Sequence, residues 1–218
     1  MPKNREKRDF DKVAASWDEK PARVRLVGDI AAAMVRQVPI TSAMDALDFG
    51  CGTGLLTLRL QPLVGSITGV DSSQGMLDIF NAKVADLELA HVGSQHCDLD
   101  KGEILTGTYD LVVSNMTLHH IKEIEPLLRQ FYTVMAPGGF LCLSDLDLEG
   151  GRFHGDNTGV FHFGFDRSAL RTLLVDAGFV DITDMTAAEM EKPDSEGVVQ
   201  RFSVFLLTAR KQGEAKPY

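Results

Sequence analysis

Apolar side chains recur at helical spacing in the first forty residues. The first stripe has the i, i+3, i+4, i+7 spacing of one helix face and consists of Phe10, Val13, Ala14 and Trp17. Pro21 interrupts this stripe, a second apolar stripe follows, and Pro39 ends it. The pattern predicts helical structure over residues 9–38, broken at Pro21.

Short apolar runs alternate with helical stripes from residue 45 onward. The apolar runs are ALDF, SITGV, YDLVVS and GFLCLS. Parallel strands need long crossover connections, so this alternation is typical of parallel strands joined by helices. The runs do not alternate strictly between apolar and polar positions, as expected when both faces of a sheet are covered. The sequence therefore predicts an α/β fold with a doubly wound sheet and helices on both faces.

The pattern changes after residue 145. Residues 146–165 are rich in Gly, His and Phe and predict a long loop. Asp166 is expected to cap a helix that ends at Gly178. Two strand candidates follow, FVDITDM and RFSVFLL, and the segment between them, AAEMEKPDSEGVVQ, carries no helical stripe. We expect that segment to be a loop that joins an antiparallel pair.

Composition narrows the class of protein. The chain has 218 residues, of which 44% are hydrophobic and 24% charged, as in ordinary globular domains. A formal net charge of -9 opposes general affinity for nucleic acids or anionic membranes. The sequence contains no secretory signal, no run of about 20 apolar residues and no CxxC pair among its three cysteines. We expect a cytoplasmic protein with reduced thiols, a small-molecule ligand, and no nucleic-acid or membrane partner.

The segment ALDFGCGTGLLTLRL indicates a ligand site. A strand is expected to end at Phe49, a glycine loop follows, and a helix is expected from about Leu55. Glycines let a ligand approach the backbone, and amides at a helix start can face it. Asp71 ends the next predicted strand, where a carboxylate can accept both hydroxyls of a ribose. The spacing GxGxG departs from the GxGxxG fingerprint for pyrophosphate. A turn with a capping Asp is the structural alternative.

These motifs together resemble class I methyltransferases that use S-adenosylmethionine. The resemblance rests on LDFGCGTG, VDSS, CDLD, YDLVVSNMTLHH and VMAPGGFLCLSD, which occur in the family's order, and it extends from about residue 10 to residue 208. FGFDRSALRTLLVDAGF is also similar to a segment of the small-molecule methyltransferases of that class. The resemblance implies a seven-stranded sheet whose last strand is antiparallel, preceded by an N-terminal helical lid. We expect the lid over residues 1–40, the methyltransferase domain over 41–210 and a flexible tail over 211–218.

The resemblance also implies cofactor-binding residues. Gly50, Gly52 and Gly54 would line the methionine and ribose part of S-adenosylmethionine. The other implied cofactor-binding residues are Asp48, Cys51, Asp71, Ser72, Met76, Asp98, Leu99, Asn115 and Met116. Asp48 would order the loop, Asp71 would bind the ribose, Met76 and Leu99 would pack beside the adenine, and Asp98 would meet its amino group. Asn115 and Met116 would border the sulfonium, although Asn115 is also interpretable as a loop cap.

Two segments carry further candidate functions. Trp17 and Arg23 lie in the expected lid, where an Arg can pair with the cofactor carboxylate. A core Trp and a solvated Arg are the alternative. His119 and His120 follow the fourth strand of the domain and are candidate catalytic bases, or else structural histidines.

A second group of histidines has no defensible motif. His154 and His162 lie in the expected long loop, and with Asp145 and Asp147 they form a possible metal constellation. A substrate-side role and loop packing are the alternatives. Because the spacing matches no known motif, we predict no metal site.

The sequence as a whole predicts transfer of a methyl group from S-adenosylmethionine to a small molecule. The absence of an Asn- or Asp-Pro-Pro-aromatic run after the fourth strand disfavours a nucleic-acid base as acceptor. A protein or nucleic-acid methyltransferase, a non-catalytic cofactor-binding module and a nicotinamide-dependent oxidoreductase are the alternatives. We expect a monomer or a homodimer, and the sequence does not identify the methyl acceptor.

Overall fold

The computed structural model describes residues 8–193 and 197–213. Its strands are β1 (Asp45–Phe49), β2 (Ser66–Asp71), β3 (Val92–His96), β4 (Tyr109–Asn115), β5 (Met135–Leu146), β6 (Phe179–Pro193) and β7 (Val199–Lys211). Its α-helices are α1 (Pro21–Gln37), α2 (Thr57–Leu60), α3 (Gln74–Asp86), α4 (Ile124–Val134) and α5 (Arg167–Asp176). Short 3₁₀ helices cover Asp11–Glu19, Gln61–Leu63, Leu99–Lys101 and Leu118–His120.

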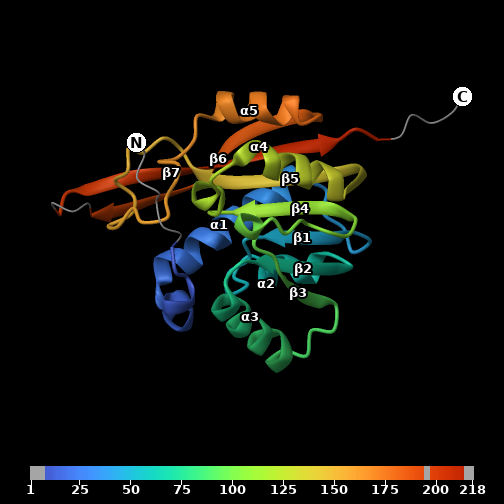
Figure 1. The fold of residues 1–218 in the computed structure, drawn as a ribbon, viewed down its shortest axis with the longest axis horizontal. Helices are drawn as coiled ribbons and strands as arrows, with labels where there is room; N and C mark the ends of the chain where they lie inside the picture. Colours follow the sequence, from blue (N-terminus) through green and yellow to red (C-terminus); the bar gives the residue numbers. More distant parts are fainter. Residues whose placement is uncertain (1–7, 194–196, 214–218) are drawn as a thin grey trace, which may run out of the picture.

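The strands form one sheet with the order β3-β2-β1-β4-β5-β7-β6. β1 to β5 are parallel, and β7 is antiparallel to both β5 and β6. The strand order reverses between β1 and β4, where open α/β sheets bind their ligands. Figure 1 shows the sheet with α5 above its β6–β7 end. The predicted doubly wound, seven-stranded sheet with an antiparallel last strand is confirmed.

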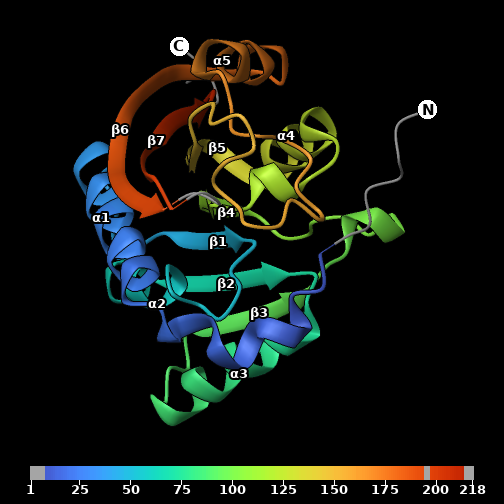
Figure 2. The same cartoon turned by 90° about the vertical axis from the view of Figure 1, so that its left-hand side faces the viewer.

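Successive residues of the strands are buried alternately in two hydrophobic cores, one on each face of the sheet. Ala46, Leu111 and Cys142 pack toward α1, α2 and α3, whereas their neighbours Leu47 and Val112 pack toward α4 and α5. Figure 2 shows α1 and α4 on opposite sides of the strands. This two-sided burial explains why the strand sequences show no polar alternation.

The N-terminal helical segment has two parts. Residues Asp11–Glu19 form a 3₁₀ helix rather than an α-helix, and α1 begins at Pro21. Pro suits this first helical position because it needs no backbone donor there. Figure 2 shows the 3₁₀ helix beside α3, away from α1's contact with the sheet. The predicted break at Pro21 is therefore confirmed.

Two expected boundaries are wrong. α2 begins at Thr57 rather than near Leu55. The segment AAEMEKPDSEGVVQ is not a loop throughout, because β6 continues to Pro193 and β7 already begins at Val199. The expected antiparallel pairing is correct. Of the expected lid and tail, residues 1–7 and 214–218 lie outside the described chain.

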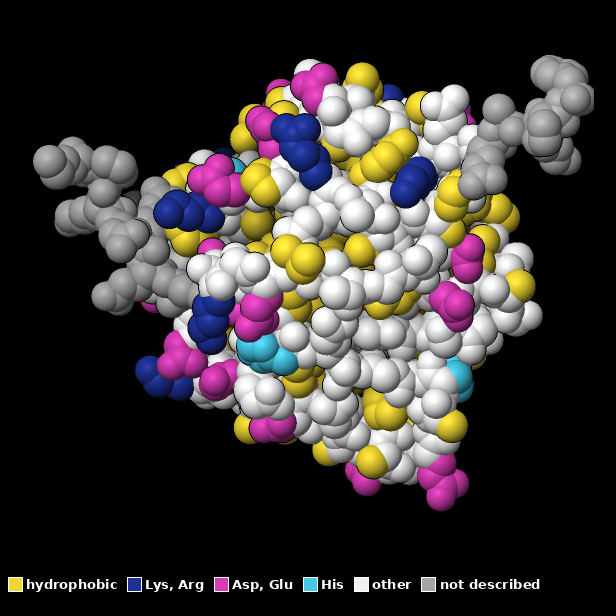
Figure 3. Space-filling view, turned by 45° about the vertical axis from the view of Figure 1, so that its right-hand side comes forward, with side chains coloured by type: hydrophobic (Ala, Val, Ile, Leu, Met, Phe, Trp, Pro, Cys, Tyr) yellow, Lys and Arg dark blue, Asp and Glu magenta, His cyan; other side chains and the backbone are white. Residues whose placement is uncertain are grey.

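The expected cap of α5 is confirmed. The Asp166 carboxylate accepts hydrogen bonds from the Ser168 and Ala169 amides, and Gly178, with a φ of 100°, follows the helix. Cys51, Cys97 and Cys142 are buried and unpaired, as expected. None of the helices in the described residues combines the length and apolar character needed to cross a bilayer. Acidic and basic side chains are interspersed on the face shown in Figure 3.

Candidate functional site

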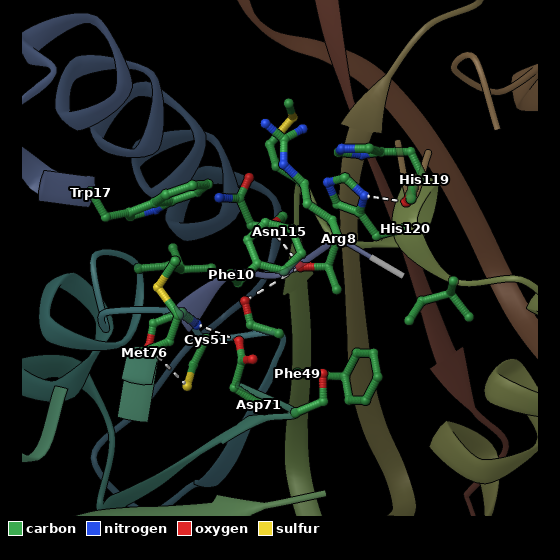
Figure 4. A pocket seen from close by; sticks show the side chains of 18 of the residues that line it. Arg8, Phe10, Trp17, Phe49, Cys51, Asp71, Met76, Asn115, His119 and His120 are labelled. Atoms are coloured by element: carbon green, nitrogen blue, oxygen red, sulfur yellow. Dashed lines mark hydrogen bonds between the residues drawn. The ribbon is translucent and has the colours of Figure 1, made fainter. Parts of the chain in front are cut away.

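A cavity of about 840 Å³ lies at the carboxyl ends of β1, β2 and β4. This volume is within the range of small-molecule and cofactor sites. Figure 4 shows Trp17 and Met76 on one side of the cavity and His119 and His120 on the other. The lining therefore combines two groups of residues that are separated in the sequence.

The glycine loop forms the floor of the cavity below Trp17. Gly50 and Gly52 follow β1 with φ values of 73° and 55°, which favour glycine. The Gly52 amide donates a 2.8 Å hydrogen bond to Asp71 Oδ2, and the Ser73 amide donates to Asp71 Oδ1 at 2.9 Å. Asp71 thus holds the loop and the start of α3 together. A Cβ on Gly52 would make only an ordinary van der Waals contact, at 3.9 Å from Met76 Sδ, so the positive φ rather than a lack of space favours glycine here.

Gly54 does not line the cavity, contrary to the expected role. A Cβ at Gly54 would lie 2.2 Å from Cδ2 of Phe80, and its φ is 83°. Phe80 is fully buried in the core. Gly54 therefore allows α3 to pack against the loop rather than a ligand to approach it.

Asp48 lies buried beneath the glycine loop. Its Oδ2 accepts a 2.6 Å hydrogen bond from the Thr57 hydroxyl at the start of α2. Burial, with a smaller contribution from the charge of Asp71, raises the pKa of Asp48 to about 7, although the hydrogen bond from Thr57 opposes the rise. This contact ties the end of β1 to α2.

The other site residues expected from the sequence all line the cavity. They are Trp17, Arg23, Asp48, Gly50, Cys51, Gly52, Asp71, Ser72, Met76, Asp98, Leu99, Asn115, Met116, His119 and His120. Asn115 also accepts a hydrogen bond from the Ser144 hydroxyl at 3.0 Å. Met116 has a φ of 54°, and such strain in a non-glycine residue is typical of functional sites.

The N-terminal 3₁₀ helix covers one side of the cavity. Asp11 accepts hydrogen bonds from the Ser73 hydroxyl and from the Gly75 amide, at 2.9 Å for the latter. Asp18 accepts a 2.6 Å bond from the Thr53 hydroxyl and pairs with Lys83. These contacts attach the helix to α3 and to the glycine loop.

Trp17 and Arg23 pack against each other in this cover. The Arg23 guanidinium carbon lies 3.6 Å from the centroid of the Trp17 ring, and the guanidinium donates to the Trp17 carbonyl. Phe10 stands edge-on to Trp17 and to His120, with ring centroids 5.8 and 5.0 Å away. Aromatic side chains therefore connect the cover to the histidines on the other side of the cavity.

His119 forms a buried pair with Asp145 of β5. Its Nδ1 donates to Asp145 Oδ1 across 2.7 Å, and its backbone amide donates to Oδ2. Burial alone would raise the pKa of Asp145, but the His119 ring and its hydrogen bonds lower it below its ordinary value. The carboxylate therefore fixes Nδ1 of His119 as the donor and leaves Nε2 without a proton in the neutral ring.

His120 and His154 lie close to this pair. His120 Nδ1 donates to the Gly159 carbonyl across 2.7 Å. Burial and the neighbouring His119 lower the pKa values of both His120 and His154 to about 3. Both rings are therefore neutral at physiological pH.

The metal constellation considered from the sequence is not assembled. His162 Nε2 lies 2.9 Å from the Ile121 carbonyl, and its ring packs on Phe165. Asp147 pairs with Arg167 and accepts from the Ser203 hydroxyl at 2.7 Å. Only His154 and Asp145 of that set lie with His119.

Several lining residues were not predicted as site residues. They include Arg8, Phe10, Lys20, Phe153 and Lys192. Burial and the charges of Lys20, Arg8 and Arg23 lower the pKa of Lys192, so these cations lie near one another at the cavity. No motif contains them, and a net charge of -9 gives no sign of a local cationic group.

Comparison with known proteins finds similarity to methyltransferases over part of the chain. Residues 46–139 match the family model described as a methyltransferase domain. An uncharacterised methyltransferase of Schizosaccharomyces pombe is 36% identical over 138 residues, covering 56% of this chain and 48% of the relative. Demethylmenaquinone methyltransferase of Staphylococcus aureus is 31% identical over 114 residues, covering 50% and 46%. The chain thus spans about half the length of these curated relatives.

A solved structure has the same fold. Phosphoethanolamine N-methyltransferase 2 of Haemonchus contortus, in complex with S-adenosyl-L-methionine, superposes with a TM-score of 0.68. The match has 17% identity and covers 93% of this chain and 60% of that one. The motif order, the sheet topology and the match over residues 46–139 agree, and this part of the chain is similar to the methyltransferase domain of the class I methyltransferases.

Proposed function

We propose that this chain transfers a methyl group from S-adenosylmethionine to a small-molecule acceptor. The proposal rests on one observation: the glycine loop, Asp71 and the histidines after β4 all line the same cavity. The demethylmenaquinone methyltransferase relative, by its name, also acts on a small molecule. A cavity of about 840 Å³ is large enough for a cofactor and a small acceptor together.

The residues of the loop side fit the cofactor. The Asp71 carboxylate is held by two backbone amides at the end of β2, where ribose hydroxyls are bound in doubly wound folds. Met76 and Leu99 offer apolar surface for the adenine, and Asp98 offers a buried carboxylate for its amino group. Arg23 supplies a cation for the cofactor carboxylate.

The histidine side is proposed to hold the acceptor. When bound, the cofactor supplies a methyl group on positively charged sulfur, so the protein mainly aligns the acceptor and excludes water. The covered cavity, with Trp17 and Phe10 over it, serves that exclusion. His119 and His120 are the candidate bases for an acceptor that carries a proton, and Asp145 orients His119 for that role.

Calorimetry with S-adenosylhomocysteine tests the cofactor half of the proposal. We expect Asp71→Ala to weaken binding by more than about tenfold, since a hydrogen bond to a charged group contributes about 1.5–3 kcal/mol. Asp86→Ala, on the exposed end of α3, is the matched control and should bind as the wild type does. Absence of binding by the wild-type chain at millimolar ligand would refute the proposal.

Acceptor turnover tests the other half. Formation of S-adenosylhomocysteine is measured against quinols, phenols, amines and thiols as small-molecule acceptors. Turnover with one of these classes, lost in Asp71→Ala, is the expected result. Cofactor binding without turnover of any of them would instead favour a binding module.

A further inference from the structure

Three histidine side chains meet on the acceptor side of the cavity. His119, His120 and His154 each offer a ring nitrogen, and these nitrogens all lie within 4.8 Å of one another. The ring centroids are separated by 4.1 Å (119–120), 5.1 Å (119–154) and 5.6 Å (120–154). Figure 4 shows His119 and His120 side by side at this end of the cavity.

Hydrogen bonds orient two of these rings in the manner of metal ligands. Asp145 accepts from Nδ1 of His119, and the Gly159 carbonyl accepts from Nδ1 of His120. The neutral tautomer that makes each of these hydrogen bonds carries its lone pair on Nε2. Metal-binding histidines usually donate their other ring N–H to a carboxylate or a backbone carbonyl, as these two do.

His154 supplies the third nitrogen. Its Nε2 is buried and has no hydrogen-bond partner among the described residues. A buried polar atom without a partner costs about 1–3 kcal/mol, so such atoms in a native structure usually meet an ion or a water. The backbone amides of Phe161 and His162 donate to the His119 carbonyl, which fixes the loop that carries His154 against the other two rings.

We propose that His119, His120 and His154 bind a divalent transition metal ion of the zinc class. Imidazole nitrogens suit this class, and three histidines that leave one position open are a known zinc arrangement. Zn–N bonds of about 2.0–2.1 Å in a tetrahedral site place ligand nitrogens roughly 3.4 Å apart. The three nitrogens lie within 4.8 Å of one another, so binding of an ion requires them to approach by up to about 1.4 Å.

The charges around the cluster favour an anion as the fourth ligand of the ion. Arg8 and Lys192 near His154 oppose a divalent ion, whereas the buried Asp145 carboxylate favours it. An anionic oxygen or sulfur at the open position would be attracted by the ion and by these cations. This ligand is hydroxide or the acceptor itself.

The metal changes the role of the histidines. A nitrogen whose lone pair binds a metal cannot also accept a proton, so His119 and His120 would be ligands rather than bases. The ion would instead lower the pKa of the hydroxyl or thiol it holds. Metal binding itself requires neither cofactor nor acceptor, so it can be tested independently of methyl transfer.

Metal titration of the purified, tag-free chain tests the proposal. After treatment with a chelator, Zn²⁺ is titrated by calorimetry, and Co²⁺ is titrated by visible absorption, which reports tetrahedral coordination. We expect one equivalent of either ion per chain and displacement of Co²⁺ by Zn²⁺. His154→Ala should weaken Zn²⁺ binding at least a hundredfold, and His120→Ala should do the same.

His162→Ala is the matched control, because His162 lies in the same loop but contacts the Ile121 carbonyl and Phe165 instead of the cluster. It should keep the wild-type affinity and stoichiometry. Binding of S-adenosylhomocysteine is measured for each variant to show that the fold persists. The proposal is overturned if the wild type binds no stoichiometric Zn²⁺, or if folded His154→Ala and His120→Ala bind it as the wild type does.

Discussion

The buried carboxyl group of Asp48 makes stability depend on pH near neutrality. Burial raises its pKa from an ordinary value of 3.8 to about 7 in the folded chain. Between these two values the folded state keeps a proton that the unfolded state has lost. The contribution of this proton to the free energy of unfolding is therefore complete below pH 3.8 and is lost as the pH rises through this window. Each pKa unit is equivalent to roughly 1.4 kcal/mol, so the full loss is on the order of 4 kcal/mol.

Asp48→Asn removes this dependence while retaining an oxygen that can accept from Thr57. The free energy of unfolding of the wild type should fall relative to that of the variant as the pH rises from about 4 to about 8. The expected change in the difference is on the order of 4 kcal/mol. Urea unfolding at several pH values measures it, and other titrating groups cancel in the difference. Asp29→Asn, at an exposed position of α1, should give a flat difference. A flat difference for Asp48→Asn as well would refute the argument.

Two further predictions concern packing and acid stability. Gly54→Ala should cost about 3 kcal/mol in denaturant unfolding, because the new Cβ meets Phe80 at 2.2 Å and the φ of 83° is strained for alanine. Gly93→Ala, with nothing within 4 Å of the added Cβ, should leave stability nearly unchanged. For His120 and His154, the folded pKa values of about 3 lie below the ordinary 6.5, so the folded chain binds fewer protons between them. Stability should fall as pH decreases from 6.5 toward 3, and equal slopes in a His120→Gln/His154→Gln variant would contradict this.

The central sheet was predictable because its residues obey one local rule. The central parallel strands β1, β4 and β5 are buried on both faces, so their sequences show continuous apolar runs, and the crossover helix α4 shows one apolar stripe. Leu127, Leu128 and Phe131 lie on such a stripe and are buried in one core. The glycine loop was predictable for a similar reason, since Gly50 and Gly52 need positive φ values wherever this turn occurs.

The far end of β6 was missed because edge strands carry a weaker pattern. Ala188 is buried while Glu189 and Glu191 are not, and Glu189 forms a cross-strand ion pair with Arg201. This period of two was present in AAEMEK, but the lack of a helical stripe was interpreted as a connection between two shorter strands. A strand with one solvated face needs that alternation as its main evidence.

The histidine cluster was not predictable from spacing. His119 and His120 follow β4, whereas His154 lies more than thirty positions later in the long loop. Their proximity depends on contacts such as that of His120 Nδ1 with the Gly159 carbonyl, which no local pattern encodes. Sequence analysis identified each histidine as a candidate but grouped His154 with His162, which the fold separates.

The two sides of the cavity share a tight contact at Gly50. A Cβ on Gly50 would lie 2.2 Å from Thr117 Oγ1, and this hydroxyl contacts the Gly50 carbonyl at 3.3 Å. Thr117 directly precedes the 3₁₀ helix that carries His119 and His120. A displacement of the glycine loop must therefore displace the turn before the histidines, because close-packed atoms transmit strain. Glycine is therefore required at position 50 for a structural reason, independent of cofactor approach: the close contact fixes the distance between the loop and the histidines.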